Sequence, residues 1–168
     1  MKLTKKANSQ NLLADANTPT TTNTNAQVSK MPAVKAKATW IENVRSIVDN
    51  QRTHSVVCDL STPAGGTDSG PTALELSLMA LADCGVTIFA DVCKKSNIEL
   101  SKVEVTVEAE KSPDSPVITG VCMKVQVSSN ARKELVEAAW RRTEANCPVL
   151  LIFKDPTPVK VEFESKTE

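Results

Sequence analysis

Polar and apolar residues alternate along several short segments of this chain, and such alternation is typical of strands with one buried face. Three of these segments precede a loop rich in Gly, Pro, Ser and Asp at 61–71, and the others follow a long apolar stretch. The segments predicted as strands are 34–40, 42–50, 53–60, 101–110, 117–127 and 158–165.

The long apolar stretch at 73–93 predicts a helix. Thr72 and Glu75 have the spacing of a capping box, in which each side chain accepts a hydrogen bond from the other residue's backbone N–H. The helix is apolar nearly all round, which predicts that it is buried. It also contains Glu75, Asp83 and Asp91, and an acid near the centre of a bilayer costs roughly 2.5–3.5 kcal/mol. We therefore expect a soluble core helix that does not cross a membrane.

A second helix is predicted from about Asn130 to Ala145, with Ser129 or Asn130 as its cap and Pro148 blocking its continuation. The order of elements is three strands, a helix, two strands, a helix and a strand. This order predicts an α+β fold in which a mainly antiparallel sheet packs on two helices. One such sheet covers only part of the long helix, so we expect a partner subunit to cover the rest.

The N-terminal residues differ from the rest in composition. Residues 1–32 are polar, rich in Thr and Asn, and are predicted to be a disordered tail before a domain at 33–168. The tail has no apolar core of the kind a signal peptide needs, so the cytoplasm is the expected location. The 20 Lys and Arg residues balance 20 Asp and Glu residues, and Tyr is absent, so we expect no nucleic-acid partner.

Cysteine is the residue type with the most chemical potential here. The five cysteines are an odd number, have no C-x-x-C spacing, and share the chain with one histidine, so we expect no disulfide scaffold and no metal site. Cys84 lies in the middle of the long helix and Cys147 at the end of the second one. The other three are interpreted as small buried apolar residues. They are Cys58, Cys93 and Cys122.

Two runs around these cysteines resemble a known family. GTDSGPTALELSLMALADCGVTIFADV at 66–92 is similar to the central-helix signature of the osmotically inducible protein C and organic hydroperoxide resistance family, and VEAAWRRTEANCPVLLI at 136–152 is similar to its second signature. The segment before them, with His54 and Asp59 in an H-x-x-x-x-D pattern, resembles one subgroup. The resemblance implies an intertwined homodimer with the long helices in the middle and an active site at each subunit interface.

The resemblance also implies a reaction that needs no cofactor. The cysteine at position 84 attacks an organic hydroperoxide and becomes a sulfenic acid, and Cys147 then condenses with it to a disulfide. A dithiol or small-thiol reductant reopens that disulfide. The apolar surroundings of Cys84 favour an alkyl hydroperoxide, because each buried methylene contributes roughly 0.8 kcal/mol.

The sequence departs from the family at the groups that activate the thiol. Peroxidases of this family hold the thiolate with an Arg–Glu pair whose Glu lies ten positions before the cysteine, and here that position is Leu74. Glu75 falls on the opposite face of the helix from Cys84, so we interpret it mainly as a capping residue and only weakly as catalytic. The candidates for the arginine are Arg45 and Arg52, and we weakly prefer Arg52.

Two further residues affect the interpretation. We expect a structural role for His54 in preference to that of a general base. Asp83, directly before Cys84, would raise the pKa of that thiol if it lay close to the sulfur. The missing Glu leaves two alternatives to a peroxidase. One is a non-enzymatic dimer that binds a small apolar or thiol ligand or senses oxidation, and the other is a structural dimer with inert cysteines.

Overall fold

The structure, a computed structural model, describes residues 33–112 and 114–167, so the predicted tail at 1–32 lies outside the described residues. The described elements follow the predicted order as far as the second helix, with small shifts in their ends, and an additional helix then stands before the place of the predicted last strand. They are β1 (Lys37–Glu42), β2 (Arg45–Asp49), β3 (Ser55–Cys58), a 3-10 turn (Thr62–Ala64), α1 (Ala73–Lys95), β4 (Leu100–Lys111), β5 (Ile118–Ser129), α2 (Lys133–Asn146) and α3 (Pro148–Lys154).

The strands form two antiparallel sheets instead of one. Strands β1, β2 and β3 pair in that order, and β4 pairs with β5 over almost their whole length. The first sheet is short, and β1 is exposed at every position. The described helices and the β4–β5 sheet make no extensive packing contact with this first sheet. Large apolar side chains of this sheet, such as Trp40, Ile47 and Val57, are therefore exposed in the described chain.

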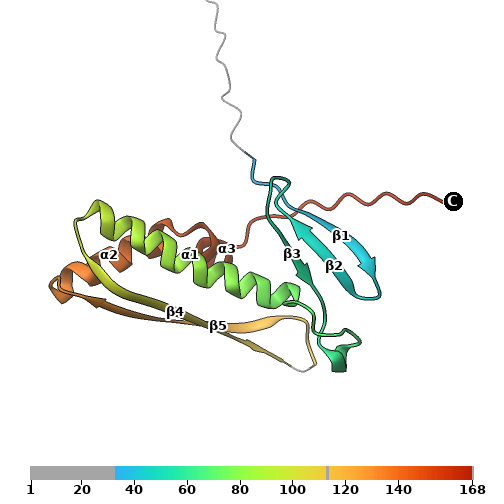
Figure 1. Cartoon of the computed structure of the whole chain (residues 1–168), viewed down its shortest axis with the longest axis horizontal. Helices are drawn as coiled ribbons and strands as arrows, with labels where there is room; N and C mark the ends of the chain where they lie inside the picture. The colour runs from blue at the N-terminus through green and yellow to red at the C-terminus, as the bar shows by residue number, and fades with distance from the viewer. Residues whose placement is uncertain (1–32, 113, 168) are drawn as a thin grey trace, which may run out of the picture. The chain divides into compact units, whose positions relative to one another are not determined.

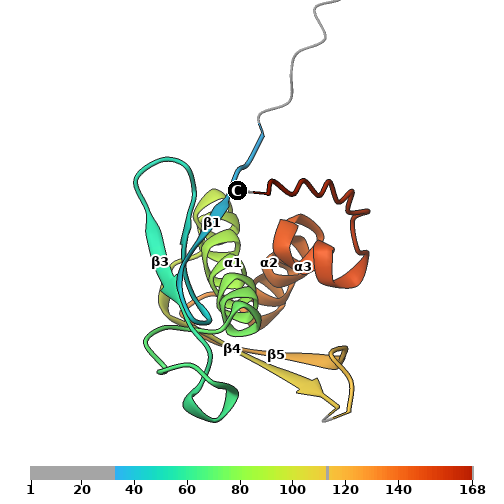
Figure 2. The same cartoon turned by 90° about the vertical axis from the view of Figure 1, so that its right-hand side faces the viewer.

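The three helices lie on one face of the β4–β5 sheet, as both views show (Figures 1 and 2). The predicted alternation is confirmed, because Val103, Val105 and Val107 of β4 are half-buried while the residues between them are exposed. The core between this sheet and the helices is built around Phe89, which meets Trp140 of α2 edge to face with 5.6 Å between ring centroids.

Helix α1 begins as predicted. Thr72 is its N-cap, its hydroxyl accepts a hydrogen bond from the Glu75 N–H, and Glu75 accepts one from the Thr72 N–H. The prediction of burial on all sides is wrong for the chain by itself: one side is buried, whereas Met79 on the other side is 54% exposed. By length and composition α1 could span a membrane, although core helices of soluble proteins meet the same criteria.

The second helical region differs from the prediction at both ends. Helix α2 starts at Lys133 after Arg132, which has no capping side chain, and the Ser129 hydroxyl instead accepts a hydrogen bond from the Ala131 N–H. The predicted cap is therefore wrong. The helix does end before Pro148, but this proline then occupies the first turn of α3, a position that suits its fixed φ and its missing N–H.

The last predicted strand, 158–165, is not formed in the described chain. This segment has no regular secondary structure and pairs with no other strand. Its three alternating apolar side chains, Val159, Val161 and Phe163, are each more than four-fifths exposed. An alternating pattern supplies one apolar face, but a strand also needs a sheet edge that accepts its backbone hydrogen bonds.

Candidate functional site

Cys84 and Cys147 meet in the structure. Their sulfur atoms lie 2.6 Å apart although 63 positions separate the two residues in the sequence. Both are free thiols in this structure. A disulfide bond measures about 2.03–2.05 Å, so the sulfurs need to approach by only a fraction of an ångström for a bond to form.

Cys147 is positioned by the junction of α2 and α3. Its N–H donates to the Thr143 carbonyl oxygen at 2.8 Å and its carbonyl accepts from the Leu151 N–H at 3.0 Å, so it caps one helix and begins the next. Pro148 has no N–H to extend α2, which forces the break at this point. Since both helices pack on α1, the junction lies beside the middle of that helix, where Cys84 is located.

The two thiols differ in their access to solvent. Cys84 is 8% exposed and Cys147 is fully buried. A reagent in solution therefore reaches Cys84 first. Of the two sulfurs, that of Cys84 is thus the more accessible in the described chain.

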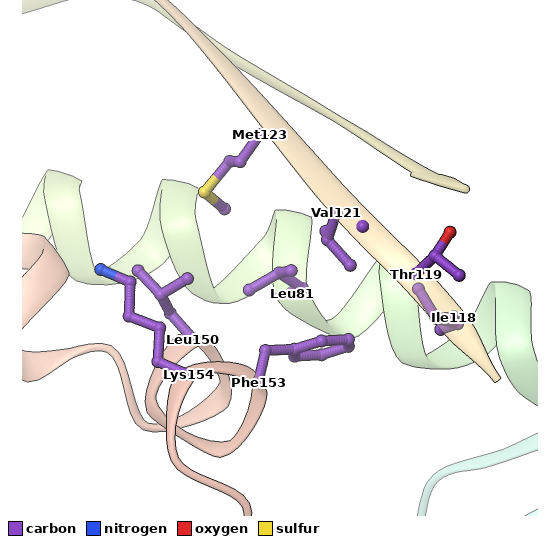
Figure 3. A pocket seen from close by; sticks show the side chains of 9 residues that line it. Leu81, Ile118, Thr119, Val121, Met123, Leu150, Phe153 and Lys154 are labelled. Carbon is purple, nitrogen blue, oxygen red and sulfur yellow. The ribbon is translucent and has the colours of Figure 1, made fainter. Parts of the chain in front are cut away.

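A pocket of about 360 Å³, which we call the α3 pocket, lies between α1, β5 and α3 and is lined mainly by apolar side chains (Figure 3). Leu81 lies one helical turn before Cys84, and Leu150 lies three positions after Cys147. The pocket falls within the usual range for small-molecule sites, roughly 300–1,000 Å³. Its lining residues are Leu81, Ile118, Thr119, Gly120, Val121, Met123, Leu150, Phe153 and Lys154.

The surroundings of Cys84 favour the neutral thiol. Burial is the largest cause that raises its pKa, and the neighbouring Cys147 raises it further. A hydrogen bond from the Val149 backbone N–H acts in the opposite direction, while the charge of Asp83 raises the pKa as the sequence predicted. Among the described residues, no cation contributes to lowering it. The described part of the chain therefore favours the neutral thiol over the thiolate at Cys84.

We expect the alkylation rate of Cys84 to climb with pH. Because the thiolate is the nucleophile and its pKa is raised, the rate with iodoacetamide should grow about tenfold per pH unit between about pH 7 and 9. Mass spectrometry of the peptide that carries Cys84 measures this rate, and the exposed Cys122 serves as an internal reference. A rate that has already reached a plateau at pH 7 would contradict the expectation.

Arg45 is engaged in a second cluster, the Asp59 cluster, which ties the β1–β2 hairpin to the loop before α1. Its guanidinium donates to Glu42 and to the Thr67 hydroxyl and lies 3.5 Å from a carboxylate oxygen of the buried Asp59. That carboxylate also accepts hydrogen bonds from Thr67 and Ser69. Burial acts to raise the pKa of Asp59, but these hydrogen bonds outweigh it and hold the pKa far below its ordinary range.

The Asp59 cluster was not foreseen as a unit. In the sequence, Asp59 stood out only through its pattern with His54. The signal that could have indicated the cluster is a single aspartate directly before a loop rich in Ser, Thr and Gly. In the described chain Arg45 therefore contacts Thr67 and Asp59 and stabilises the loop, and it makes no hydrogen bond with Cys84.

The other predicted site residues lie away from the thiols or have local partners. Arg52 is exposed in the β2–β3 turn, where its N–H donates to Asn50. His54 is also exposed, with a ring nitrogen 3.2 Å from the Asn50 amide nitrogen, as expected of a structural residue. The Glu75 carboxylate accepts hydrogen bonds from Thr72, and these lower its pKa. Nine helical residues separate Glu75 from Cys84, which corresponds to about 13 Å along the helix axis.

The remaining cysteines only partly follow the prediction. Cys58 and Cys93 are buried as expected, and burial raises the pKa of Cys93. Cys122 is exposed, so its interpretation as a buried apolar residue is wrong. It follows Val121 on the strand and points to the polar face of β5 because successive side chains alternate. The described residues contain no group of three or more His, Cys, Asp or Glu side chains that could hold a metal ion.

Comparison with known families identifies this arrangement. The family model described as OsmC-like protein matches residues 66–162, which is more than half of the chain and includes both cysteines. None of the curated protein sequences matches.

Solved structures show the same fold at low sequence identity. An OsmC-like protein from Mycoplasma pneumoniae superposes with a TM-score of 0.67 at 13% identity, covering 76% of this chain and 91% of its own. An organic hydroperoxide resistance protein OsmC from Legionella pneumophila gives 0.57 at 15%, covering 75% and 92%. A Vibrio cholerae protein assigned to organic hydroperoxide resistance, with captopril bound in one of its active sites, gives 0.54 at 15%, covering 79% and 91%.

Proposed function

Since this chain belongs to the OsmC-like family, we propose that it is a thiol-dependent peroxidase that reduces organic hydroperoxides through Cys84 and Cys147. The observation that carries the proposal is the 2.6 Å contact between the sulfurs of Cys84, which is 8% exposed, and Cys147, which is fully buried. A mainly apolar pocket that includes Leu81, from the same helix as Cys84, adds to it. An apolar pocket favours an alkyl or aryl hydroperoxide over hydrogen peroxide.

The reaction proceeds in two steps within one chain. The Cys84 thiolate attacks the terminal oxygen of the hydroperoxide, the O–O bond breaks, an alcohol leaves, and Cys84 becomes a sulfenic acid. The Cys147 thiol then attacks the Cys84 sulfur, water leaves, and a disulfide forms. A dithiol or a small thiol restores both thiols by exchange, and we place the protein in the cytoplasm, where such reductants are abundant.

A homodimer is part of this proposal. Exposed apolar side chains lie on the uncovered side of α1, on the first sheet and on the unpaired segment after α3, represented by Met79, Ile47 and Phe163. A soluble monomer rarely exposes apolar surface over so many connected elements. A second copy that covers α1 and pairs with the free strands would bury all three regions.

The test is the product of peroxide treatment. Reduced protein exposed to one equivalent of cumene hydroperoxide should lose two hydrogens per chain, and digestion without reductant should give the peptide in which Cys84 and Cys147 are linked. Denaturing electrophoresis should show this bond within a single chain. Peroxide consumption without that peptide, or linkage of other cysteine pairs, would defeat the proposed pathway.

The raised pKa of Cys84 and the engagement of Arg45 with Asp59 favour a second candidate, a dimer that binds a small apolar or thiol ligand or senses oxidation without efficient turnover. Such a protein would form the disulfide once and be reduced slowly. Steady-state assays with a dithiol in excess separate the two candidates. Sustained turnover supports the peroxidase, whereas a single burst of one equivalent supports the sensor.

A further inference from the structure

Met123 places a thioether sulfur in the wall of the α3 pocket, in addition to the sulfurs of the two cysteines. We propose that it is a modification site, converted to methionine sulfoxide by the same organic hydroperoxides that enter the α3 pocket. The inference rests on the proposed function only in assuming that the pocket admits such peroxides. Nothing in the peroxidase reaction itself requires Met123.

The position of Met123 carries the inference. It belongs to the inward-facing side of β5, and its terminal methyl group lies where a Cβ atom on Gly85 would be only 2.8 Å away. Gly85 directly follows Cys84, so the thioether rests against the backbone next to the reactive thiol. Met123 lines the α3 pocket (Figure 3). It also lines a second pocket beside Phe89 and Trp140. A peroxide that enters the α3 pocket therefore meets the Met123 side chain in its wall.

The chemistry balances with the peroxide as the only reactant. A lone pair of the Met123 sulfur attacks the terminal oxygen of the hydroperoxide, and the O–O bond breaks. That oxygen stays on sulfur as the sulfoxide, and its proton passes to the departing alkoxide, which leaves as an alcohol. The sulfur loses two electrons and the peroxide gains them. A thioether has no proton to lose, so the reaction does not depend on the protonation state that limits Cys84 at neutral pH.

Oxidation at this position would change the pocket. A sulfoxide is polar and accepts hydrogen bonds, whereas the neighbouring walls formed by Leu81, Val121 and Leu150 are apolar. Placing a polar group there without a partner weakens the binding of an alkyl chain. Excess hydroperoxide would thus slow its own reduction. Sulfoxide reductases reverse the change, so it can act as a brake.

The experiment compares two peroxides at the same sulfur. The full-length Cys84→Ser variant, which cannot consume peroxide at Cys84, is incubated with cumene hydroperoxide or hydrogen peroxide in the presence of N-acetylmethionine. Mass spectrometry gives the rate of the 16 Da gain at Met123 relative to the free amino acid. We expect this ratio to be several-fold higher with cumene hydroperoxide. Equal ratios, or a higher ratio with hydrogen peroxide, would overturn the inference.

A pocket variant provides the matched control. Val121 lines the pocket from the same strand and is 38% exposed, so Val121→Trp can narrow the pocket without entering the core. It should lower oxidation of Met123 by cumene hydroperoxide and leave oxidation by hydrogen peroxide unchanged, which also reports that the fold is intact. Equal loss with both peroxides would count against the pocket. If Met123 shows no preference for cumene hydroperoxide while the wild type turns over peroxide normally, only this inference is rejected. If Met123 shows the preference while the wild type has no turnover, only the peroxidase proposal is rejected.

Discussion

Replacement of Cys84 by serine is expected to lower the turnover of cumene hydroperoxide by about 10³-fold or more, because a hydroxyl is not ionised near neutral pH and cannot replace the thiolate. Of the two paired thiols in the described chain, Cys84 alone is not fully buried, so Cys147 is not expected to take over the first step. Peroxide loss measured with a dithiol in excess checks the result. Unchanged turnover would disprove the assignment of Cys84 as nucleophile.

Replacement of Cys147 separates the first step from the second. The variant Cys147→Ser should still form the sulfenic acid, which a dimedone adduct at Cys84 reveals, but it cannot form the linked peptide. Cys122→Ser serves as the control because Cys122 is exposed. It should behave as wild type in both assays. Loss of dimedone labelling in Cys147→Ser, with Cys122→Ser unaffected, would argue that Cys147 has a role before disulfide formation.

The second large effect is expected at Asp59. One carboxylate oxygen of Asp59 accepts hydrogen bonds from the N–H and hydroxyl groups of Thr67 and Ser69. In Asp59→Asn an amide nitrogen or a neutral oxygen takes its place, and the ionic contact with Arg45 is lost. We expect the melting temperature at pH 7 to fall by about 5 °C or more. Limited proteolysis should also cut within 61–70 sooner, because Asp59 accepts hydrogen bonds from Thr67 and Ser69 of this loop.

The stabilising effect of Asp59 is also expected to depend on pH. Because the folded pKa of Asp59 is lowered, its stabilising effect is present above the unfolded pKa near 4 and declines as the pH falls towards the folded pKa. The difference between wild type and Asp59→Asn should therefore narrow at pH 3. Asp68→Asn is the control, because Asp68 is exposed in the same loop with a φ of 58°, which asparagine tolerates. Equal melting temperatures for the two variants would contradict a special role for Asp59.

Several features of this protein could be predicted because neighbouring residues are enough to specify them. The Thr72–Glu75 capping box starts α1, the alternation along 101–110 sets the inward face of β4, and Pro148 ends α2. Family signatures around Cys84 and Cys147 singled out two cysteines from five. Each of these depends on spacing within one helix, one strand or one motif.

Other features depend on segments that are distant in the sequence. The sulfur contact exists because α2 and α3 both pack on α1, and the raised pKa of Cys84 follows from the burial that this packing creates. The partners of Arg45 could not be predicted, because an arginine side chain can reach several groups, and only the folded loop shows that it lies by Asp59. The run at 158–165 has the pattern of a strand but no paired edge. Pattern specifies which face of an element is apolar, whereas packing decides what covers that face and which ionisable groups it brings together.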